Sequence, residues 1–516
     1  MIVAIKFFRD TYVDSVMQLG GMRAMRAIDG VEWASAAMAT PANVATLRAE
    51  GVDDGQLAVA GSNDFFLVAR AVDDDTSERA LAAGEAAVLT PGPGVDSGVR
   101  SDAPRSLRDA IRAQPGTNVA VISVPGEYAT LAAYKALSAD LHVLLFSDDV
   151  DLDKEIALKE YAASRGLLVM GPGAGTAMLG GVGLGFANAV PPGRVGIVAA
   201  AGTGAQEAMA LLARWGVGVS QVIGLGGRDL SAQVGGRMAR SAMAALRADP
   251  GTDVILFISK PPSPEVATAA LATAGSASGE TPVVAGLIGL PADFPAPPGV
   301  VLADTLESSV LATLRLLGVA APDTTSTLGP SVDQVRRRLA PGRSLICGLF
   351  SGGTLCYESL VILGRTIGEV RSNTPVNKNW GLPAPDGSHQ CLDLGEEEYT
   401  KGRPHPMIDA EARIELLRKH SADSQVGAII LDVVLGHGAN ADPAGIMAPV
   451  CEEVMAGGGP QVVAYVLGTE QDPQGYTSQR EKLVRAGCIV TETAARASLV
   501  AAAIALGDPG LVATPL

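Results

Sequence analysis

Short, mostly apolar runs alternate with helical segments through most of the chain. From about residue 105 the order is strand NVAVISVP, a helix through Leu137, strand HVLLFSD, a helix to Gly166 and strand LLVMGPG. Runs of this kind, separated by segments of helical periodicity, predict parallel strands joined by helices. Because both faces of such strands are apolar, we expect helices on both faces of each sheet. The pattern predicts an α/β protein with several doubly wound parallel-sheet domains.

The first ninety residues follow a different order. Strand VAIKFF is followed by a helix to about Ala27, strand VEWASAAM, a helix ending near Gly51, strand DFFLVARAV and helix SERALAAGEAAVL. This order predicts a small α+β domain of ferredoxin-like type over residues 1–90. Residues 90–104, TPGPGVDSGVRSDAP, are rich in Pro, Gly, Ser and Asp and are predicted to form a linker.

The later part of the chain contains an internal repeat. Strand RVGIVAAA, turn GTG and helix AQEAMALLARWG at 194–216 match strand RSLICGLF, turn SGG and helix TLCYESLVILG at 343–364. Four further strands match in order: VSQVIGLGG with HQCLDLGEE, DVILFISK with GAIILDVVLG, PVVAGLIG with QVVAYVLGTE, and VVLADT with CIVTET. Each copy has the length of one domain. We expect the two domains to pack about a pseudo-twofold axis that brings their equivalent turns together.

Composition narrows the class of protein. Of 516 residues, 47% are hydrophobic and 18% charged, which indicates a well-buried globular protein rather than a disordered one. A formal net charge of −16 without a basic run argues against a nucleic-acid partner. The five cysteines are scattered without a CxxC pair, so we expect reduced thiols and no zinc site. Charges at Lys6 and Arg9 come too early for a signal peptide, and no apolar stretch is long enough to span a membrane. The sequence predicts a soluble cytoplasmic protein without metal or cofactor.

The two matching turns are the strongest candidate for a ligand site. Ligands of doubly wound sheets lie at the carboxyl ends of the strands, where helix N-termini carry unpaired N–H donors and a partial positive charge. Glycine lets a backbone approach an anion closely, and Ser or Thr adds a hydroxyl group. One such turn can equally be a plain tight turn, but two at matching places favour a shared phosphate site. The candidate phosphate-binding residues are Gly202, Thr203, Gly204, Ser351, Gly352, Gly353 and Thr354.

Arg403 and His405, in the segment KGRPHP, are candidate catalytic residues. The arginine could grip a carboxylate or phosphate with two hydrogen bonds, and the histidine could shuttle a proton. Alternatively, Arg403 pairs with Glu396 or Glu398 on the surface and His405 faces solvent.

Two further candidates for catalysis follow strands of the second copy. Asp393, in CLDLGEEE, could orient the basic pair or cap a helix. His437, in LGHGAN, lies at the carboxyl end of a strand, where it could meet a ligand or fill a turn.

Candidate substrate-binding residues come from three loops. Arg228 and Lys260 follow strands of the first copy and could neutralise an anion, or form surface salt bridges. Asn377 and Lys378 lie in the polar segment RSNTPVNKNW after the second turn's helix.

Longer segments resemble known proteins. The segment from GPGAGTAMLGG to QVIGLGG is similar to the α-subunit of succinyl-CoA synthetase, and QCLDLGEEEYTKGRPHPMID, LDVVLGHGANADPAG and VVAYVLGTEQDP are similar to the ligase domain of its β-subunit. Over essentially the whole chain, FSGGTLCYE, DLGEEEYTKGRPHPMID and LDVVLGHGA resemble the signatures of the FdrA family. The resemblance implies a truncated CoA-binding-like Rossmann domain over 105–190. It also implies flavodoxin-like ligase domains of succinyl-CoA-synthetase type over 191–330 and 340–516.

The chain departs from succinyl-CoA synthetase in four places. A Gly-rich CoA loop is missing before NVAVISVP, and Gly173 stands where that family has Asn. The segment 262–300 has no histidine to carry a phosphoryl group, and no segment resembles an ATP-grasp domain. The FdrA resemblance implies a different role, as one subunit of an oxamate carbamoyltransferase of allantoin catabolism, in complex with two unrelated proteins. That enzyme interconverts carbamoyl phosphate plus oxamate with oxalurate plus phosphate. The alternatives are an NDP-forming acyl-CoA synthetase and a non-catalytic scaffold or regulatory subunit, and a homo-oligomer is the alternative assembly.

Overall fold

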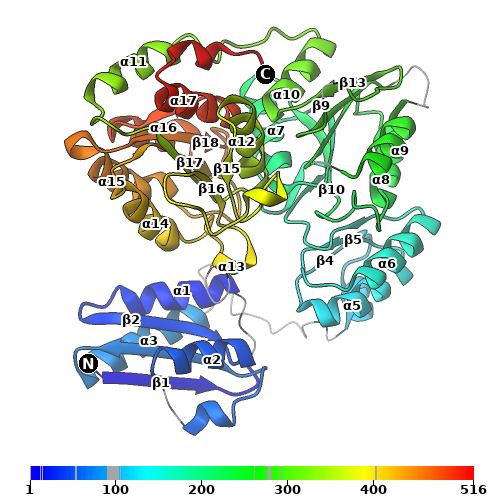
Figure 1. The fold of residues 1–516 in the computed structure, drawn as a ribbon. Coiled ribbons are helices and arrows are strands. Elements are labelled where there is room, and N and C mark those ends of the chain that lie inside the picture. Colours follow the sequence, from blue (N-terminus) through cyan, green and yellow to red (C-terminus); the bar gives the residue numbers. More distant parts are fainter. Residues whose placement is uncertain are drawn as a thin grey trace. The chain divides into compact units, whose positions relative to one another are not determined.

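The structure of the chain is a computed structural model. It describes residues 2–11, 13, 15–52, 55–89, 104, 106–260, 262–275, 281–291, 293–400 and 404–516. The chain divides into two units, residues 1–105 with 401–404 and residues 106–400 with 405–516, and each is described by itself (Figure 1). The finer division into four domains remains a prediction.

The first unit is a small α+β domain, as predicted. Its elements are β1 (Ile2–Phe8), α1 (Ser15–Arg26), β2 (Val31–Met38), α2 (Pro41–Ala49), β3 (Phe65–Ala71) and α3 (Asp74–Leu89). The three strands form an antiparallel sheet in the order β1-β3-β2. Alternate residues of β3 point to opposite faces: Phe65 and Leu67 pack in the core that includes α1 and α3, while Phe66 and Val68 pack in the core that includes α2. Except for Pro104, the predicted linker lies outside the described residues.

The second unit begins with a short parallel sheet in the order β4-β5-β6. Its elements are α4 (Leu107–Ala113), β4 (Val119–Ile122), α5 (Gly126–Ser138), β5 (His142–Leu145), α6 (Leu152–Ser164) and β6 (Val169–Met170).

A seven-stranded sheet follows, in the order β13-β12-β11-β9-β10-β7-β8. Its strands are parallel except for β7 and β8, which are antiparallel. These two strands come before residue 191, the predicted start of the domain, and still belong to its sheet. Its elements are β7 (Thr176–Leu179), β8 (Val182–Gly185), β9 (Pro192–Ala199), α7 (Gly202–Arg214), β10 (Val219–Gly224), α8 (Arg237–Ala248), β11 (Val254–Ser259), α9 (Pro264–Gly275), β12 (Val283–Leu287), β13 (Val300–Ala303) and α10 (Leu306–Leu316).

The last sheet has six parallel strands in the order β15-β16-β14-β17-β18-β19. After α11 (Leu328–Arg338) its elements are β14 (Leu345–Phe350), α12 (Gly353–Thr366), β15 (Val370–Arg371), β16 (His389–Asp393), α13 (Glu397–Thr400), α14 (Glu411–Ser421), β17 (Val426–Val434), α15 (Pro443–Met455), β18 (Gln461–Leu467), α16 (Tyr476–Arg485), β19 (Ile489–Thr491) and α17 (Ala494–Leu506).

The strand orders confirm the predicted repeat. The run β13-β12-β11-β9-β10 in one sheet corresponds, strand for strand, to β19-β18-β17-β14-β16 in the other. Counted along the chain, both follow the flavodoxin-like order 2-1-3-4-5. The predicted fold class, several doubly wound sheets with a small N-terminal α+β domain, is therefore confirmed.

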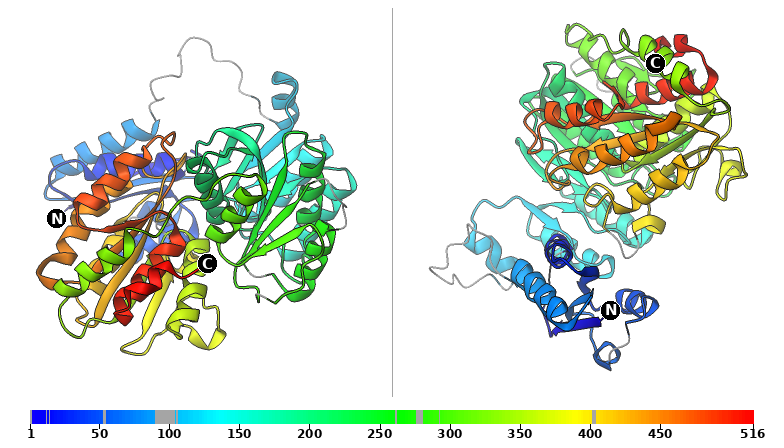
Figure 2. Two further views of the ribbon diagram at one scale, coloured as in Figure 1. Left: turned by 90° about the horizontal axis from the view of Figure 1, so that it is seen from above. Right: turned by 90° about the vertical axis from the view of Figure 1, so that its left-hand side faces the viewer.

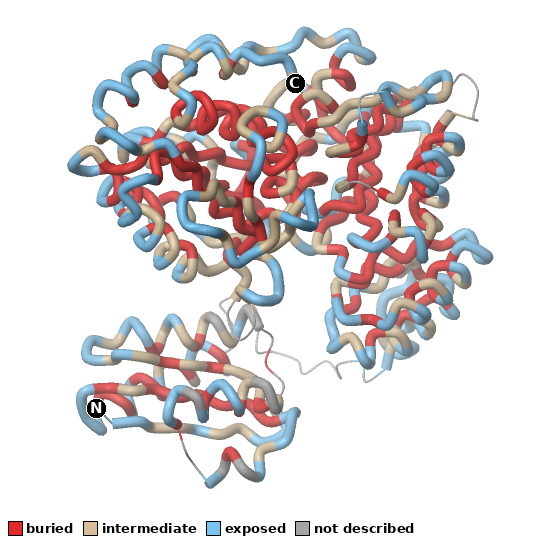
Figure 3. Tube along the Cα trace, in the orientation of Figure 1, coloured by how far each residue is buried: buried red, intermediate tan, exposed pale blue. Residues whose placement is uncertain are grey.

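One apolar core joins the two large sheets. In β11, Leu256 and Ile258 belong to the same core as α7 and α10, whereas Ile255 and Phe257 belong to the core of α8 and α9. In β17, Ile430 belongs to that first core, with α12 and α17, whereas Ile429 packs in a third core with α14 and α15. An inner layer between the two sheets is therefore formed by helices α7, α10, α12 and α17. Most residues of these helices and of the neighbouring strands are buried (Figures 2 and 3).

The described residues contain no helix with both the length and the apolarity needed to cross a membrane.

Candidate functional site

The two predicted turns meet inside the second unit. Helix α7 begins at Gly202 directly after β9, and α12 begins at Gly353 directly after β14. The backbone N–H of Thr354 donates to Thr203 Oγ1 at 3.2 Å. The helix N-termini of the two halves are therefore in direct contact at the strand carboxyl ends, where flavodoxin-like sheets bind ligands.

This close approach requires glycine. A Cβ atom on Gly353 would lie under 3.0 Å from Asp393 Oδ2, and one on Gly352 would lie 3.0 Å from the Thr203 methyl group. The second turn thus lacks a Cβ where Thr203 of the opposing half comes close and where Asp393 of its own half does.

A cavity of about 340 Å³ lies at the junction, and we call it the cradle cavity. Its wall includes eight of the residues predicted from the sequence: Gly202, Thr203, Lys260, Ser351, Gly353, Thr354, Asp393 and His405. The first three N–H groups of α7 have no intrahelical acceptor, and its N-cap residue Ala201 makes no side-chain capping bond. Together with the partial positive charge of the helix end, these donors suit an anion.

The side chain of Asp432 accepts hydrogen bonds from the second turn, and the sequence interpretation missed this residue. Its carboxylate accepts hydrogen bonds from Ser351 N (2.8 Å), Ser351 Oγ (2.9 Å) and Gly352 N (2.7 Å). The guanidinium of Arg413 lies 3.1 Å from the same carboxylate, and both side chains are buried. The expectation that Ser351 and Gly352 donate to a phosphate is corrected, because a carboxylate of the chain already accepts these donors. A charged residue in the otherwise apolar strand GAIILDVVLG was the available signal.

Asp393 and Lys260 bring opposite charges to the cradle cavity from the two halves. Asp393 ends β16 and is held by Asn373, which bonds both its N–H and its C=O, at 2.9 and 2.8 Å. One carboxylate oxygen accepts the N–H of Gly395 at 3.0 Å. Burial raises the pKa of Asp393 to about 6, although the Lys260 ammonium opposes the rise. This carboxyl group therefore changes charge near neutrality, as a general base should.

His405 presents one ring nitrogen to the cradle cavity. Its Nδ1 accepts the backbone N–H of Met407 at 3.2 Å, so the neutral ring carries its proton on Nε2. Nε2 lies 2.9 Å from the position that a Cβ on Gly395 would take, which makes Gly395 a spacer for the ring. Burial lowers the pKa of His405, so the neutral donor form is favoured. Arg403, predicted to act with it, lies outside the described residues.

Several predicted residues do not reach the cradle cavity. Arg228 donates to the C=O of Val150 at 2.6 Å and pairs with Glu155 at 2.9 Å, which is the salt-bridge alternative. His437 is exposed, and its backbone N–H donates to the C=O of Ala187. Neither residue lines the cradle cavity, and their predicted roles in substrate binding and catalysis stay predictions.

The remaining predicted residues are also placed apart from the cavity wall. Asn377 Oδ1 accepts the N–H of Asn379 in a short 3₁₀ turn, and Lys378 is exposed there. Gly204 packs against the methyl groups of Thr354 and Ile258 rather than lining the cavity. Gly173, which replaces the Asn of succinyl-CoA synthetases, does line it.

Comparisons with known proteins identify the family. Residues 349–504 match the CoA-ligase family model, and residues 1–101 match the model described as AllF, heavy metal-associated domain. The uncharacterized protein YahF of Escherichia coli K12 is 37% identical over 510 residues, which covers 97% of this chain and 98% of YahF. The chain belongs to the FdrA family. This FdrA-family chain is also 27% identical to the Methanothermobacter thermautotrophicus succinate–CoA ligase [ADP-forming] subunit alpha, over 33% of this chain and 57% of that subunit.

Solved structures are more distant from the FdrA-family chain. The acetyl-coenzyme A synthetase 1 of Ca. Korarchaeum cryptofilum aligns over 77% of this chain and 84% of that one, with 15% identity and a TM-score of 0.30. The ATP citrate lyase of Methanothrix soehngenii aligns over 79% and 84%, with 13% identity and a TM-score of 0.34.

The heavy-metal name of the N-terminal match does not fit this chain's residues. Residues 1–101 contain neither Cys nor His, so methionines are the sulfur ligands that the segment offers a soft metal. The match describes a fold, and no metal chemistry follows from it.

Proposed function

We propose that this FdrA-family chain transfers an acyl group from an acyl phosphate to a nucleophile, with the phosphate held in the cradle cavity. The observation that carries the proposal is the open N-terminus of α7 beside Lys260, at the junction with α12 that the Thr354–Thr203 hydrogen bond marks. A leaving phosphate is stabilised by such donors and by an ammonium group, because they oppose the charge that develops on it.

The other groups in the cavity have complementary roles. His405 Nε2–H donates to the carbonyl oxygen as negative charge develops on it. Asp393 removes the proton of the nucleophile while the carbonyl carbon forms its new bond and the bond to the phosphate oxygen breaks. Phosphate leaves with its electron pair, and Asp393 holds the proton. The step needs no metal or redox partner.

The thiol of CoA is the acceptor that the comparisons favour. The CoA-ligase match covers the second half, and the relative from M. thermautotrophicus is a succinate–CoA ligase subunit. A CoA thioester forms when a thiol displaces phosphate from an acyl phosphate, which is the step described above. In this version the substrate is a small carboxylic acyl phosphate, in keeping with a cavity of about 340 Å³.

Carbamoyl phosphate with oxamate is the second candidate, and the orientation of His405 favours it. Since Nδ1 accepts the Met407 N–H, Nε2 of the neutral ring is a donor and not a nucleophile. A phosphohistidine at this residue is therefore disfavoured, and direct transfer from carbamoyl phosphate needs none.

Ligand protection followed by turnover tests the proposal. Thermal unfolding of the full chain is measured with phosphate, acetyl phosphate, carbamoyl phosphate, CoA and ATP. Phosphate and an acyl phosphate should raise the unfolding temperature; protection by CoA selects the first acceptor, and protection by carbamoyl phosphate with oxamate selects the second. Phosphate release is then measured with the matching pair, with and without candidate partner subunits. Failure of every phosphate compound to protect the chain contradicts the proposal and favours a scaffold.

A further inference from the structure

A second, larger cavity lies between the two halves of the second unit. Its volume is about 740 Å³, and we call it the Arg214 cavity. Its wall combines the C-terminal end of α7, with Arg214 and Trp215, the segment 322–328 that leads into α11, and the first turns of α16. None of its lining residues lines the cradle cavity.

Hydrogen-bond donors without acceptors gather in this wall. Arg214 Nη2 donates to the C=O of Glu492 at 2.5 Å, but its Nε and Nη1 are buried and have no acceptor among the described residues. The same holds for Tyr476 Oη and Arg480 Nε. A buried polar group without a partner costs about 1–3 kcal/mol, so a cluster of four points to an acceptor from outside the chain.

The Arg214 guanidinium is fixed in place by aromatic rings. Its centre lies 4.5 Å from the Tyr476 ring centroid and 5.9 Å from that of Tyr465. The contacts with the two rings hold the guanidinium beside the cavity, and its unpaired N–H groups can donate only in the plane of the group.

Two of the three carboxylates in the wall accept backbone N–H groups. Asp323 accepts the N–H groups of Thr325 (2.9 Å) and Ser326 (3.1 Å), and Glu470 accepts that of Thr477 at 2.9 Å. Glu492 lies 3.6 Å from Arg480, too far for a hydrogen bond. Two of the three carboxylates thus have backbone partners, whereas the four buried donors have none.

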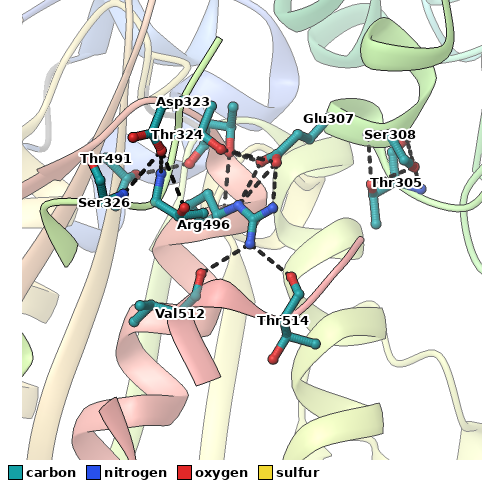
Figure 4. Close-up of polar contacts among 12 residues, drawn as sticks. Thr305, Glu307, Ser308, Asp323, Thr324, Ser326, Thr491, Arg496, Val512 and Thr514 are labelled. Atoms are coloured by element: carbon teal, nitrogen blue, oxygen red, sulfur yellow. Dashed lines mark hydrogen bonds and ion pairs between the residues drawn. The ribbon is translucent and has the colours of Figure 1, made fainter. Parts of the chain in front are cut away.

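The opposite wall is anchored to a buried ion pair. Thr324 Oγ1 donates to Glu307 at 3.3 Å, and Arg496 binds the same carboxylate through Nε and Nη2 at 2.6–3.1 Å (Figure 4). Arg496 Nη1 also donates to the C=O groups of Val512 and Thr514. This network fixes the hydroxyl-rich segment 322–328 without help from a ligand, so the cavity is pre-formed.

We propose that the Arg214 cavity binds a small organic anion, a phosphate ester or a polycarboxylate, through Arg214, Arg480 and Tyr476. Its site is separate from the cradle cavity and does not depend on the function proposed there. Trp215 and the Tyr476 ring supply a surface for the body of the ligand, and the volume suits a mononucleotide-sized molecule.

Trp215 supplies a local signal for the test. The chain has three tryptophans, so the Trp33→Phe/Trp380→Phe background leaves Trp215 as the single tryptophan, which is excited selectively at wavelengths that tyrosine does not absorb. Fluorescence of this full-length protein is titrated with AMP, citrate and inorganic phosphate, and with adenosine as the uncharged control. We expect a saturable change with AMP or citrate and none with adenosine.

Variants locate the site. Arg214→Gln or Arg480→Gln should weaken binding at least about tenfold, the loss of a charge-assisted hydrogen bond, and Tyr476→Phe about threefold. Arg418→Gln removes a surface arginine that pairs with Glu453 on α15 and should not change binding. Gly353→Ala alters only the cradle cavity and should also leave the Trp215 signal intact.

Three results would overturn the proposal: no saturable change with any of the three anions, equal weakening in Arg418→Gln and Arg480→Gln, or loss of the signal in Gly353→Ala. If Arg214→Gln does not fold, Arg480→Gln and Tyr476→Phe decide, and unchanged binding in both contradicts the site.

Discussion

At the residue scale, Asp393 is the group whose protonation most directly controls the proposed chemistry. It is buried at the end of β16, fixed at both backbone groups by Asn373, and close to the ammonium of Lys260. Burial favours its neutral form, the nearby ammonium favours its charged form, and the balance leaves its pKa at about 6. The proposed base is therefore active only above that pH.

The pH dependence of turnover tests this role. Phosphate release should rise with pH through about 6, because the base must be ionised to take a proton. Asp393→Asn should lower the rate about 100-fold or more at pH 7.5 and remove the rise. Asp409→Asn, a like change outside the cavity wall, should keep both the rate and the profile. A wild-type profile in Asp393→Asn would rule the residue out as the base.

At the element scale, the position of α12 depends on a glycine start. A helix that begins at Gly353 can bring its first turn against Asp393 and Lys260, whereas any Cβ there would collide with the carboxylate. The need for glycine arises from the contacts at the junction and not from the helix itself. Gly364 of the same helix has open space around its Cβ position.

A matched pair of substitutions separates these effects. Gly353→Ala should displace Asp393 and reduce phosphate release at least about tenfold, which corresponds to a loss of about 1.4 kcal/mol in the transition state. Gly364→Ala should retain activity and stabilise the helix by up to about 1 kcal/mol, since Ala has the higher helix propensity. Turnover and chemical denaturation of both variants provide the measurement. Equal activities would show that the junction tolerates a Cβ.

At the scale of the whole molecule, buried acids connect the two halves. The carboxyl group of Glu207 on α7 accepts a hydrogen bond from the hydroxyl group of Tyr465 on β18, and both side chains are buried. Burial raises the pKa of Glu207 to about 7, although the Tyr465 hydrogen bond opposes the rise. Because the unfolded chain ionises this group near its usual value of 4.5, the folded protein binds the proton more tightly between these two values.

The stability of the wild-type protein should therefore fall as pH rises from about 4.5 to 7 through this group, and level off above. The fall is on the order of 3 kcal/mol for a shift of this size. Glu207→Gln keeps an acceptor for Tyr465 and lacks the charge, so its stability relative to wild type should increase over that range. Urea unfolding at pH 5 and pH 8 measures the difference. Glu452→Gln, on the exposed side of α15, should stay within about 0.5 kcal/mol of wild type at both values; the same result for Glu207→Gln would contradict the prediction.

The sequence was most informative about this largest scale. Five paired strand segments predicted the shared strand order of the two large sheets, and the glycine-rich turns predicted where those sheets meet, because both follow from local patterns. The partner of each polar group was not predictable in the same way. Asp432 reaches Ser351 from 81 residues away, and Arg228 pairs with Glu155 on helix α6, which precedes the seven-stranded sheet in the chain. Such choices depend on how the sheets pack, so the candidate site was recovered in part and the Arg214 cavity was not foreseen.

The internal carboxylate of Asp432 has a consequence for how a duplicated architecture is used. Two like halves offer two equivalent helix N-termini. In this chain the Asp432 carboxylate occupies donors of the turn before α12, whereas the N-terminus of α7 stays open. The duplication thus yields one anion site and not two. The cradle cavity should bind one phosphate per chain, with a stoichiometry of one in a binding titration.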